Sequence, residues 1–324
     1  MQWESRAGPC YSGEAICAVT RVKVFKTYAE QVELLRSRGM RIDNVGRAEK
    51  ELAQLNYYRL SGYWYPMRRF SSGTRKACDE FVDGASFDLV IDLYEFDEQM
   101  WHVVFGELDR IEMAIRTMLG YRLGSIDPFI YRDVKRLSAS ARQQNKGSSR
   151  SKHAVWMEKF ERAAKSSRED FVEHHRKHYQ GDMPIWAAVE IMDWGMLSYL
   201  YDFSPTYVRD DIAHECRLTA PQLASWLKCL NIVRNYVAHH ARIFNRVFDI
   251  KPKLSNDERL QAVAGVSNRS FGQLSLIQYL HRQLGLSPAN RLPQLLDMFP
   301  HNDVVPLSRT GAPDGWQKLA VWER

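Results

Sequence analysis

Apolar residues recur at helical spacing through most of the chain after residue 26, and this pattern predicts helices that each bury one face. Alternation of apolar and polar residues is weak, and no Asn-Gly hairpin turn is present. The predicted helices begin after Thr27 and after Asp43 or Asn44, then cover 87–123, a segment from Ala154, 184–201, a helix from Ala220 into the segment 232–248, and about 272–284. The fold class that follows is all-α, a helical bundle.

The longest periodic segment runs from Phe87 to Leu123 and predicts either one long helix or two helices in a bundle. Its apolar stripe comprises Leu89, Leu93, Phe96, Met100, Val104, Leu108, Ile111 and Ile115. An aromatic-rich stretch at residues 56–66 precedes it and ends at Pro66. We interpret that stretch as a core anchor, because aromatic side chains bury large apolar areas.

Two segments depart from the helical pattern. Residues 1–25 have no clear period and are expected to form an irregular N-terminal extension, so that the helical domain covers residues 26–324. Residues 138–153 are polar, basic and rich in serine, and are expected to form a loop. A solvated linker and a dedicated RNA contact are the two explanations that stay open for this loop.

Charge and cysteine content narrow the class of protein. The chain has 45 Lys and Arg against 39 Asp and Glu, for a net charge of +6 and a pI near 9.0. This balance favours an acidic partner, of which nucleic acid is the commonest, without requiring one. The five cysteines are scattered and form no Cys-x-x-Cys pair, which argues against a disulfide framework and a four-thiolate zinc site. No apolar run is long enough to span a membrane or to form a signal peptide, so we expect a cytoplasmic protein.

One polar stripe carries candidate chemistry if residues 232–248 form a single helix. At about 100° per residue, the stripe comprises Asn235, His239, Arg242 and Arg246. The opposite, apolar face comprises Val233, Val237, Phe244 and Phe248. Arg234 flanks the stripe, and Ala238 leaves room beside His239 for a ligand.

These residue types suit phosphodiester chemistry. Histidine titrates near neutral pH and can act as a general base or a general acid. Guanidinium groups can hold a phosphate and stabilise the charge that develops on its oxygens. RNA supplies its own nucleophile, the 2′-OH, so that neither a metal nor another cofactor is required. The candidate catalytic residues are therefore Arg234, Asn235 and His239.

A second explanation of the same pattern stays open: a solvated basic face whose histidine caps or pairs with a neighbour. A similar spacing of Arg and His occurs at Arg209 and His214 and at Arg168 and His174. The adjacent Asn235 and the amphipathic surroundings distinguish the Arg234 segment from these.

His240 is a further candidate in this segment. It lies about 100° from His239 towards the apolar face, and we interpret it as packed or as a bystander. It nevertheless stays with Arg242 and Arg246 among the candidate RNA contacts. Salt bridges within the bundle are an equally open role for the two arginines.

Residues 234–246 closely resemble the RN-x-x-x-H-x-x-R signature of HEPN-fold ribonucleases, and more narrowly the Abi-like proteins of the AbiD/AbiF abortive-infection group. Other segments agree with that group in the same order. They are 27–39, 57–63 (the most distinctive motif), 87–117, 184–190, 195–198, 298–300 and 316–322. The resemblance covers about residues 26–324.

The resemblance implies a HEPN-type helical bundle with additional N- and C-terminal helices, which usually works as a dimer. Two Arg/His motifs would then meet across a composite cleft. The implied activity is metal-independent RNA cleavage by 2′-OH attack, leaving a 2′,3′-cyclic phosphate and a 5′-OH, in a phage-defence or toxin–antitoxin system. His239 would be the general base or acid, Arg234 the phosphate ligand, and Asn235 the residue that positions His239 or the substrate.

The resemblance also implies supporting residues and partners. Glu190 and Glu112 match family positions that orient an arginine, and we expect both to form buried structural ion pairs. The expected partners are an RNA substrate, a second copy of the chain and an inhibitory antitoxin, either a noncoding RNA or a neighbouring protein. The alternative function is a non-catalytic HEPN module for RNA binding or protein interaction; the intact Arg234, Asn235 and His239 favour the enzyme.

Overall fold

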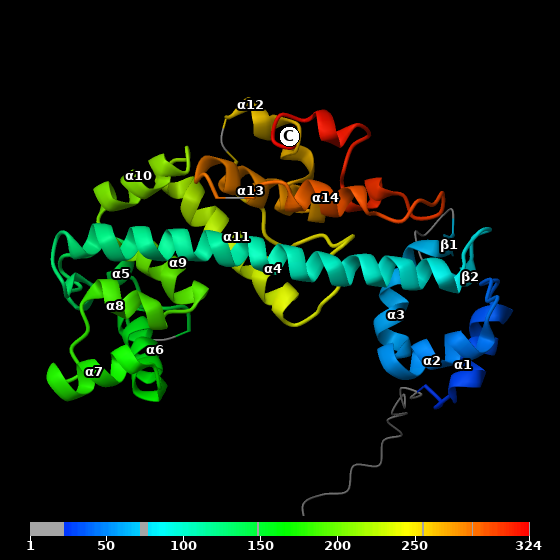
Figure 1. The fold of residues 1–324 in the computed structure, drawn as a ribbon, viewed down its shortest axis with the longest axis horizontal. Helices are drawn as coiled ribbons and strands as arrows, with labels where there is room; N and C mark the ends of the chain where they lie inside the picture. The colour runs from blue at the N-terminus through cyan, green and yellow to red at the C-terminus, as the bar shows by residue number, and fades with distance from the viewer. Residues whose placement is uncertain (1–22, 72–76, 148, 255, 287, 324) are drawn as a thin grey trace, which may run out of the picture.

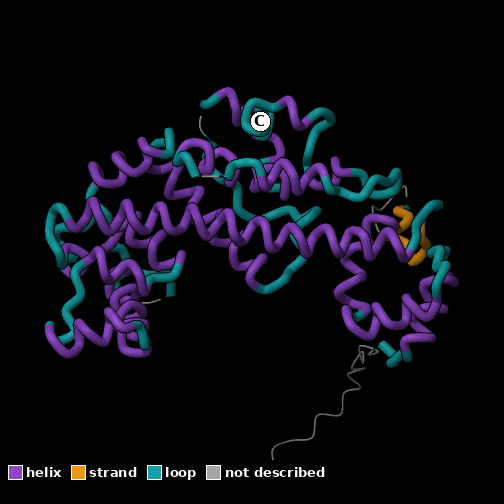
Figure 2. The backbone as a smooth tube through the Cα atoms, in the orientation of Figure 1, coloured by secondary structure: helices purple, strands orange, loops and turns teal. Residues whose placement is uncertain are grey.

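The computed structural model describes the chain except for residues 1–22, 72–76, 148, 255, 287 and 324 (Figure 1). The described part is mostly helical (Figure 2), so the predicted all-α fold class is confirmed. Nearly all of the expected N-terminal extension lies outside the described residues. None of the described helices is both long enough and apolar enough to cross a membrane.

The central element is α4 (Phe87–Gly124), a single helix of 38 residues that runs along the molecule (Figure 1). Ser86 caps its N-terminus by accepting a hydrogen bond from the amide of Leu89. At 1.5 Å per residue the helix is about 57 Å long. All eight residues of the predicted apolar stripe are buried, which confirms the periodicity. The other elements therefore pack along a continuous support.

Three helices lie at one end of α4: α1 (Tyr28–Ser37), α2 (Val45–Leu55) and α3 (Tyr57–Trp64). Thr27 and Glu30 form a capping box at the start of α1, and Asn44 caps α2, as the sequence predicts. The aromatic stretch is a core anchor only in part: Tyr63 and Trp64 are buried, whereas Tyr58 and Tyr65 are exposed.

A short antiparallel hairpin follows α3, although no strand was expected. It consists of β1 (Arg68–Phe70) and β2 (Ala77–Phe81), with Arg68 opposite Phe81 and Phe70 opposite Ala77. Strands of three and five residues are too short to give an alternating pattern that the sequence can reveal. Tertiary contacts hold the hairpin instead, since the amide of Phe81 also donates to the carbonyl of Arg38 at 2.8 Å.

The other end of α4 is covered by α5 (Ala139–Arg142), α6 (Lys152–Ser166), α7 (Asp170–His178), α8 (Ile185–Ala188) and α9 (Trp194–Phe203) (Figure 1). The prediction of a loop at residues 138–153 is wrong in part, because α5 and a bridge between Gln144 and Ser151 lie within it. The serines have structural roles there: the hydroxyls of Ser138 and Ser140 donate to the carbonyl and the carboxylate of Asp202 at 2.8 and 2.6 Å.

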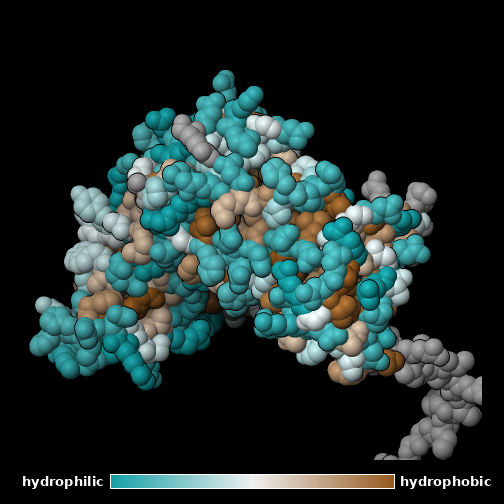
Figure 3. Space-filling view, turned by 45° about the vertical axis from the view of Figure 1, so that its right-hand side comes forward, coloured by the Kyte–Doolittle hydropathy of each residue, from teal (hydrophilic) through white to brown (hydrophobic). Residues whose placement is uncertain are grey.

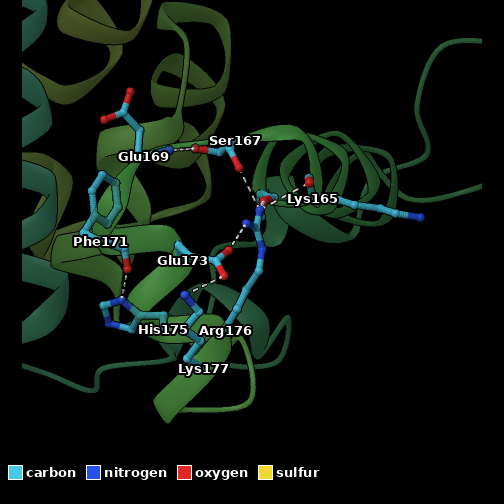
Figure 4. Close-up of polar contacts among 9 residues, drawn as sticks. Lys165, Ser167, Glu169, Phe171, Glu173, His175, Arg176 and Lys177 are labelled. Atoms are coloured by element: carbon cyan, nitrogen blue, oxygen red, sulfur yellow. Dashed lines mark hydrogen bonds and ion pairs between the residues drawn. The ribbon is translucent and has the colours of Figure 1, made fainter.

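Arg176 of α7 closes the C-terminus of α6 (Figure 4). Its Nη2 donates to the carbonyls of Ala164, Lys165 and Ser167, and its Nη1 donates to the Glu173 carboxylate at 2.9 Å. The last carbonyls of a helix have no partner within the helix. The arginine supplies that partner from the next helix and so fixes the α6–α7 corner.

The predicted helix over residues 184–201 is interrupted. α8 continues into a 3-10 turn at Val189–Ile191, and the chain is extended at Met192 before α9 begins. Asp193 caps α9 by accepting a hydrogen bond from the amide of Met196 at 2.8 Å. Aspartate is a common N-cap residue, but the regular spacing of apolar residues through this segment predicts one continuous helix and gives no sign of the break.

The C-terminal part comprises α10 (Thr206–Glu215), α11 (Ala220–Ala238), α12 (Glu258–Gln261), α13 (Ser270–Gln283) and α14 (Arg291–Asp297). α13 confirms the helix predicted at about 272–284. Short 3-10 turns occur at Tyr65–Met67, Ile130–Arg132, Ala264–Val266, Leu307–Thr310 and Trp316–Lys318. α13 and α14 lie along one side of α4, and the loop that follows α11 begins below α4 and crosses to the upper side, where α12 lies (Figure 1).

The molecule has the outline of an arch. The α1–α3 end and the α5–α9 end extend to the same side of α4, and the surface is hollowed between them (Figure 3). The loop after α11, which carries the candidate chemistry, lies between the two ends (Figure 1).

Cys78, Cys216 and Cys229 are free thiols, while the other two cysteines lie outside the described residues.

Candidate functional site

The candidate catalytic residues lie in the last turn of α11. The helix starts with a capping box between Thr219 and Gln222 and ends at Ala238, with His239 as its C-cap. Arg234 and Asn235 are therefore helical, and His239 is the first residue to leave the helix. The structure thus brings the three candidate catalytic residues to one helix end.

The C-terminus of α11 is a Schellman turn. The amide of His240 donates to the carbonyl of Val237 at 3.0 Å, and the amide of Ala241 donates to the carbonyl of Tyr236 at 2.9 Å. His240 has φ 51°, the left-handed conformation that glycine usually supplies at this position. Because a histidine, not a glycine, takes the left-handed conformation here, the spacing of apolar residues in the sequence does not reveal that the helix ends.

The prediction of one helix over residues 232–248 is therefore wrong. Arg242 and Arg246 lie in the loop beyond α11 and do not continue a stripe with Asn235 and His239. The physical reason is non-local: the amides of Ile243 and Phe244, which a continued helix would direct to its own carbonyls, donate instead to the carboxylate of Asp97 on α4.

Arg234 is partly buried against α4. Its guanidinium carbon lies 5.7 Å from the centroid of the Phe105 ring, a cation–π contact. The positive charge of Arg234 acts to lower the pKa of two nearby carboxyl groups, Glu112 and Asp193. Burial raises the pKa of Glu112, and the hydrogen bond from Arg116 and the charges of Arg116 and Arg234 oppose that rise. Burial also acts to raise the pKa of Asp193, but Lys159, the Met196 amide and Arg234 bring that pKa below its ordinary value.

His239 and Asn235 have exposed side chains. Neither side chain makes a hydrogen bond to any of the described residues; the link between the two is the amide of His239, which donates to the carbonyl of Asn235 at 3.1 Å. The imidazole is thus open to a ligand, and its place is fixed by the backbone alone.

The three candidate RNA contacts have distinct surroundings. The His240 ring packs edge-on against Trp101, with centroids 5.3 Å apart. The Arg246 guanidinium lies 4.0 Å from the centroid of the Tyr236 ring, and its Nε donates to the carbonyl of Arg242. Arg242 is partly buried, and burial lowers its pKa, while the charge of Asp97 opposes this change.

The arginines around the end of α11 are not neutralised by ion pairs. Within the described chain, no carboxylate oxygen lies within 4.0 Å of the guanidinium nitrogens of Arg59, Arg234, Arg242 or Arg246. Elsewhere arginines are commonly paired, as Arg122 is with both Asp211 and Glu215 at 2.8 and 3.0 Å. The site therefore carries positive charge that an anionic ligand can compensate.

Glu112 and Glu190 both contact Arg116 on α4. Glu112 is nearly buried, with 11% of its side chain exposed, and its Oε1 lies 2.7 Å from Arg116 Nη2. Glu190 is 44% exposed and its carboxylate is 3.7 Å from Arg116, so that this ion pair is not a buried one. The carbonyls of Glu190 and Met192 accept from the same arginine at 2.8 and 2.9 Å. Arg116 thus fixes the turn between α8 and α9 beside the site.

Sequence reasoning missed Arg59, Asp97 and Trp101 as neighbours of the site. Asp97 had a detectable signal: it lies inside the apolar stripe of α4, next to Phe96, and a carboxylate at a core position needs hydrogen-bond partners. Arg59 and Trp101 gave no such signal. No cluster of three or more His, Cys, Asp or Glu side chains in the described part of the chain is arranged to hold a metal ion.

Comparison with known protein families identifies a relationship. The family model of Abi-like proteins matches residues 50–245, more than half of the chain. The matched range contains α3, α4 and the whole of α11, including Arg234, Asn235 and His239. No curated protein and no solved structure matches the chain.

Proposed function

This chain belongs to the Abi-like protein family, and we propose that it is a metal-independent endoribonuclease that acts in the cytoplasm in a phage-defence or toxin–antitoxin system. One observation carries the proposal. An exposed imidazole, His239, ends a helix around which Arg59, Arg234, Arg242 and Arg246 have no carboxylate partner among the described residues. An acid–base group beside uncompensated guanidinium groups suits a phosphodiester.

The proposed reaction is an internal transfer within RNA. The 2′-oxygen attacks the adjacent phosphorus, the bond from phosphorus to the 5′-oxygen breaks, and the products are a 2′,3′-cyclic phosphate and a 5′-hydroxyl. His239 takes the proton of the 2′-OH or gives a proton to the leaving 5′-oxygen. Arg234 binds the phosphate and stabilises the charge on its oxygens, and Asn235 positions His239 or the substrate.

The remaining arginines suit the RNA backbone. Arg242 and Arg246 lie beside the helix end with their charges unpaired by carboxylates. Contacts of this kind give affinity that depends on salt rather than on base sequence. We assign His240 a structural place in the turn, against Trp101, rather than an RNA contact.

The active form is proposed to be a HEPN-type homodimer. His239 is exposed in the protomer, whereas Arg234 is partly buried against α4. A two-fold axis near the end of α11 would bring two copies of each residue to one cleft, with one imidazole available as base and the other as acid. An antitoxin, either RNA or protein, would act by covering this cleft.

The alternative is a non-catalytic module that binds RNA or a protein. The unpaired arginines favour it as much as they favour the enzyme, because both need an anionic ligand. The exposed His239 favours the enzyme, since binding alone does not require a group that can transfer a proton.

The test is cleavage of an RNA oligonucleotide in the presence of EDTA, beside the same oligonucleotide with a single 2′-deoxy substitution at the cleaved position. The enzyme is expected to cut the first and to leave the second intact at that position. Cleavage of both would contradict the 2′-OH mechanism. Tight binding of both with cleavage of neither, in a verified dimer, would favour the binding module.

A further inference from the structure

Four of the five residues that follow His239 are held by side chains from α3 and α4. Arg59 Nη1 of α3 donates to the carbonyl of His240 at 2.7 Å, and the Trp101 indole of α4 donates to the carbonyl of Ala241 at 3.0 Å. The carboxylate of Asp97 accepts from the amides of Ile243 and Phe244, the latter at 2.8 Å. We call Arg59, Tyr63, Asp97 and Trp101 the loop clamp.

Tyr63 completes the clamp through contacts with Asp97 and Phe244. Asp97 is fully buried, and the Tyr63 hydroxyl donates to it at 2.8 Å. The Tyr63 ring also stacks on Phe244, with centroids 5.9 Å apart and planes within 9°. A buried carboxylate with three hydrogen-bond donors is satisfied only while the loop keeps this conformation, and losing one donor costs more than an ordinary hydrogen bond contributes.

Gly62 lies between Arg59 and Tyr63 on α3, and its missing side chain leaves room for Arg242. A Cβ atom at Gly62 would lie 2.9 Å from Nε and 3.1 Å from Cδ of Arg242. The arginine side chain therefore lies directly on the backbone of α3. Any larger residue at this position displaces the half-buried guanidinium.

His239 itself has no side-chain partner in the described chain, and the residue after it is left-handed. Its imidazole is therefore located by the backbone on its two sides: α11 before it and the clamped loop after it. The α3 residues of the clamp, with Gly62, come from the segment 57–63, in which Leu60 and Tyr63 also pack in the core.

We propose that Arg59, Tyr63 and Asp97 are positioning residues for the site: by holding residues 240–244 they fix the place of the His239 imidazole relative to Arg234. This inference rests on the proposed ribonuclease function. A displacement of about 1 Å in a catalytic group can reduce a rate by about a hundredfold, so the clamp acts on turnover and not on RNA affinity.

The first test compares Arg59→Ala and Tyr63→Phe with Arg176→Ala, in kcat, KM and free energy of unfolding. Arg176 is a matched control, because it too donates to backbone carbonyls that end a helix, at the α6–α7 corner (Figure 4). We expect Arg59→Ala to lower kcat about tenfold or more with KM nearly unchanged. Arg176→Ala should lower stability and leave kcat unchanged.

Two results would overturn the proposal. A higher KM with unchanged kcat in Arg59→Ala would make Arg59 a direct RNA ligand, and Arg59→Lys would then restore KM by its charge alone. A loss of kcat in Arg176→Ala in proportion to its loss of stability would mean that the clamp merely stabilises the fold.

The second test does not depend on RNA. Amide hydrogen exchange of the intact protein should accelerate at Ala241, Ile243 and Phe244 in Arg59→Ala, and remain at the wild-type rate there in Arg176→Ala. Unchanged exchange at these amides would overturn the clamp even if the protein cuts RNA. A wild-type protein that cuts no RNA would contradict the proposed function, and the exchange rates would still decide whether the clamp holds the loop.

Discussion

Arg234 and His239 end the same helix in opposite surroundings: the Arg234 guanidinium carbon lies 5.7 Å from the centroid of Phe105 and is partly buried, whereas the His239 imidazole is exposed. Packing fixes the first group, and only the backbone fixes the second. A group anchored in the fold and a group presented at the surface together suit a site that a second surface completes. This relationship underlies the proposed dimer.

The dimer predicts that activity depends on protein concentration. With RNA in excess over all protein, the rate per wild-type chain should fall on dilution below the dissociation constant of the dimer. Excess His239→Ala should suppress the wild type, because mixed dimers replace active ones. A rate per chain that is the same at every concentration, and unaffected by His239→Ala, would show that a monomer acts.

Arg234→Ala is expected to reduce kcat/KM for RNA by about a hundredfold or more, the usual effect of removing one group that stabilises a developing oxyanion. Arg234→Lys keeps the charge but not the two-pronged geometry, and should recover only part of the loss. Arg234 has no carboxylate partner within 4.0 Å in the described chain and is held by one cation–π contact with Phe105, so its removal should lower the free energy of unfolding by only about 1 kcal/mol. Arg209→Ala, at the same spacing from His214, is the control and should cut RNA at the wild-type rate.

Asp97 predicts a pH dependence of stability. Its burial raises its pKa to about 7, although the hydrogen bonds from Tyr63 and the amides of Ile243 and Phe244 oppose the rise. The folded protein thus holds this proton more tightly than the unfolded chain, whose aspartate titrates near pH 3.9. The resulting stability is fully present below about pH 4 and is lost as the pH rises through about 7.

The measurement is the free energy of unfolding of wild type minus that of Asp97→Asn, followed from about pH 4 to 8. Because one pKa unit corresponds to about 1.4 kcal/mol, this difference should fall by a few kcal/mol over the range. Asn keeps the shape and an acceptor oxygen but does not titrate. A difference that stays constant, or rises with pH, would contradict the assignment.

His240 predicts an unusual preference for glycine. Since φ is 51° at this position, His240→Gly should be more stable than His240→Ala by about 1 kcal/mol, as judged by denaturant unfolding. Both variants lose the contact with Trp101, so the difference between their free energies of unfolding reports only the cost of the left-handed backbone conformation at residue 240. Ala238→Gly, one residue before the C-cap, is the control with the opposite sign, because glycine weakens a helix interior by up to about 1 kcal/mol. Equal stability of the two His240 variants would rule out the left-handed turn.

Much of the fold could be predicted from the sequence because local signals specify it. The caps at Thr27 and Asn44 and the stripe of α4 are properties of neighbouring residues, and α1, α2 and α4 follow from them. The hairpin β1–β2 could not be predicted, because its strands are short and contacts with distant residues hold them.

The site was predictable only up to His239. Arg234, Asn235 and His239 lie together because they share a helix end, which the motif already implies. Arg242 and Arg246 leave the predicted stripe because Asp97 captures the amides of Ile243 and Phe244, and that carboxylate is 146 positions away from Ile243 in the chain. No periodicity within residues 232–248 contains this information.

The central claim is that His239 performs acid–base chemistry on RNA, and one comparison tests it most directly: the initial rate of RNA cleavage in EDTA by wild type, His239→Ala and His214→Ala. His214 is an exposed histidine five residues after an arginine on α10, which matches the spacing of the candidate site. The account predicts equal cleavage by wild type and His214→Ala, with 2′,3′-cyclic phosphate ends, and a rate lower by about a hundredfold or more in His239→Ala. Cleavage by His239→Ala at the wild-type rate would contradict it.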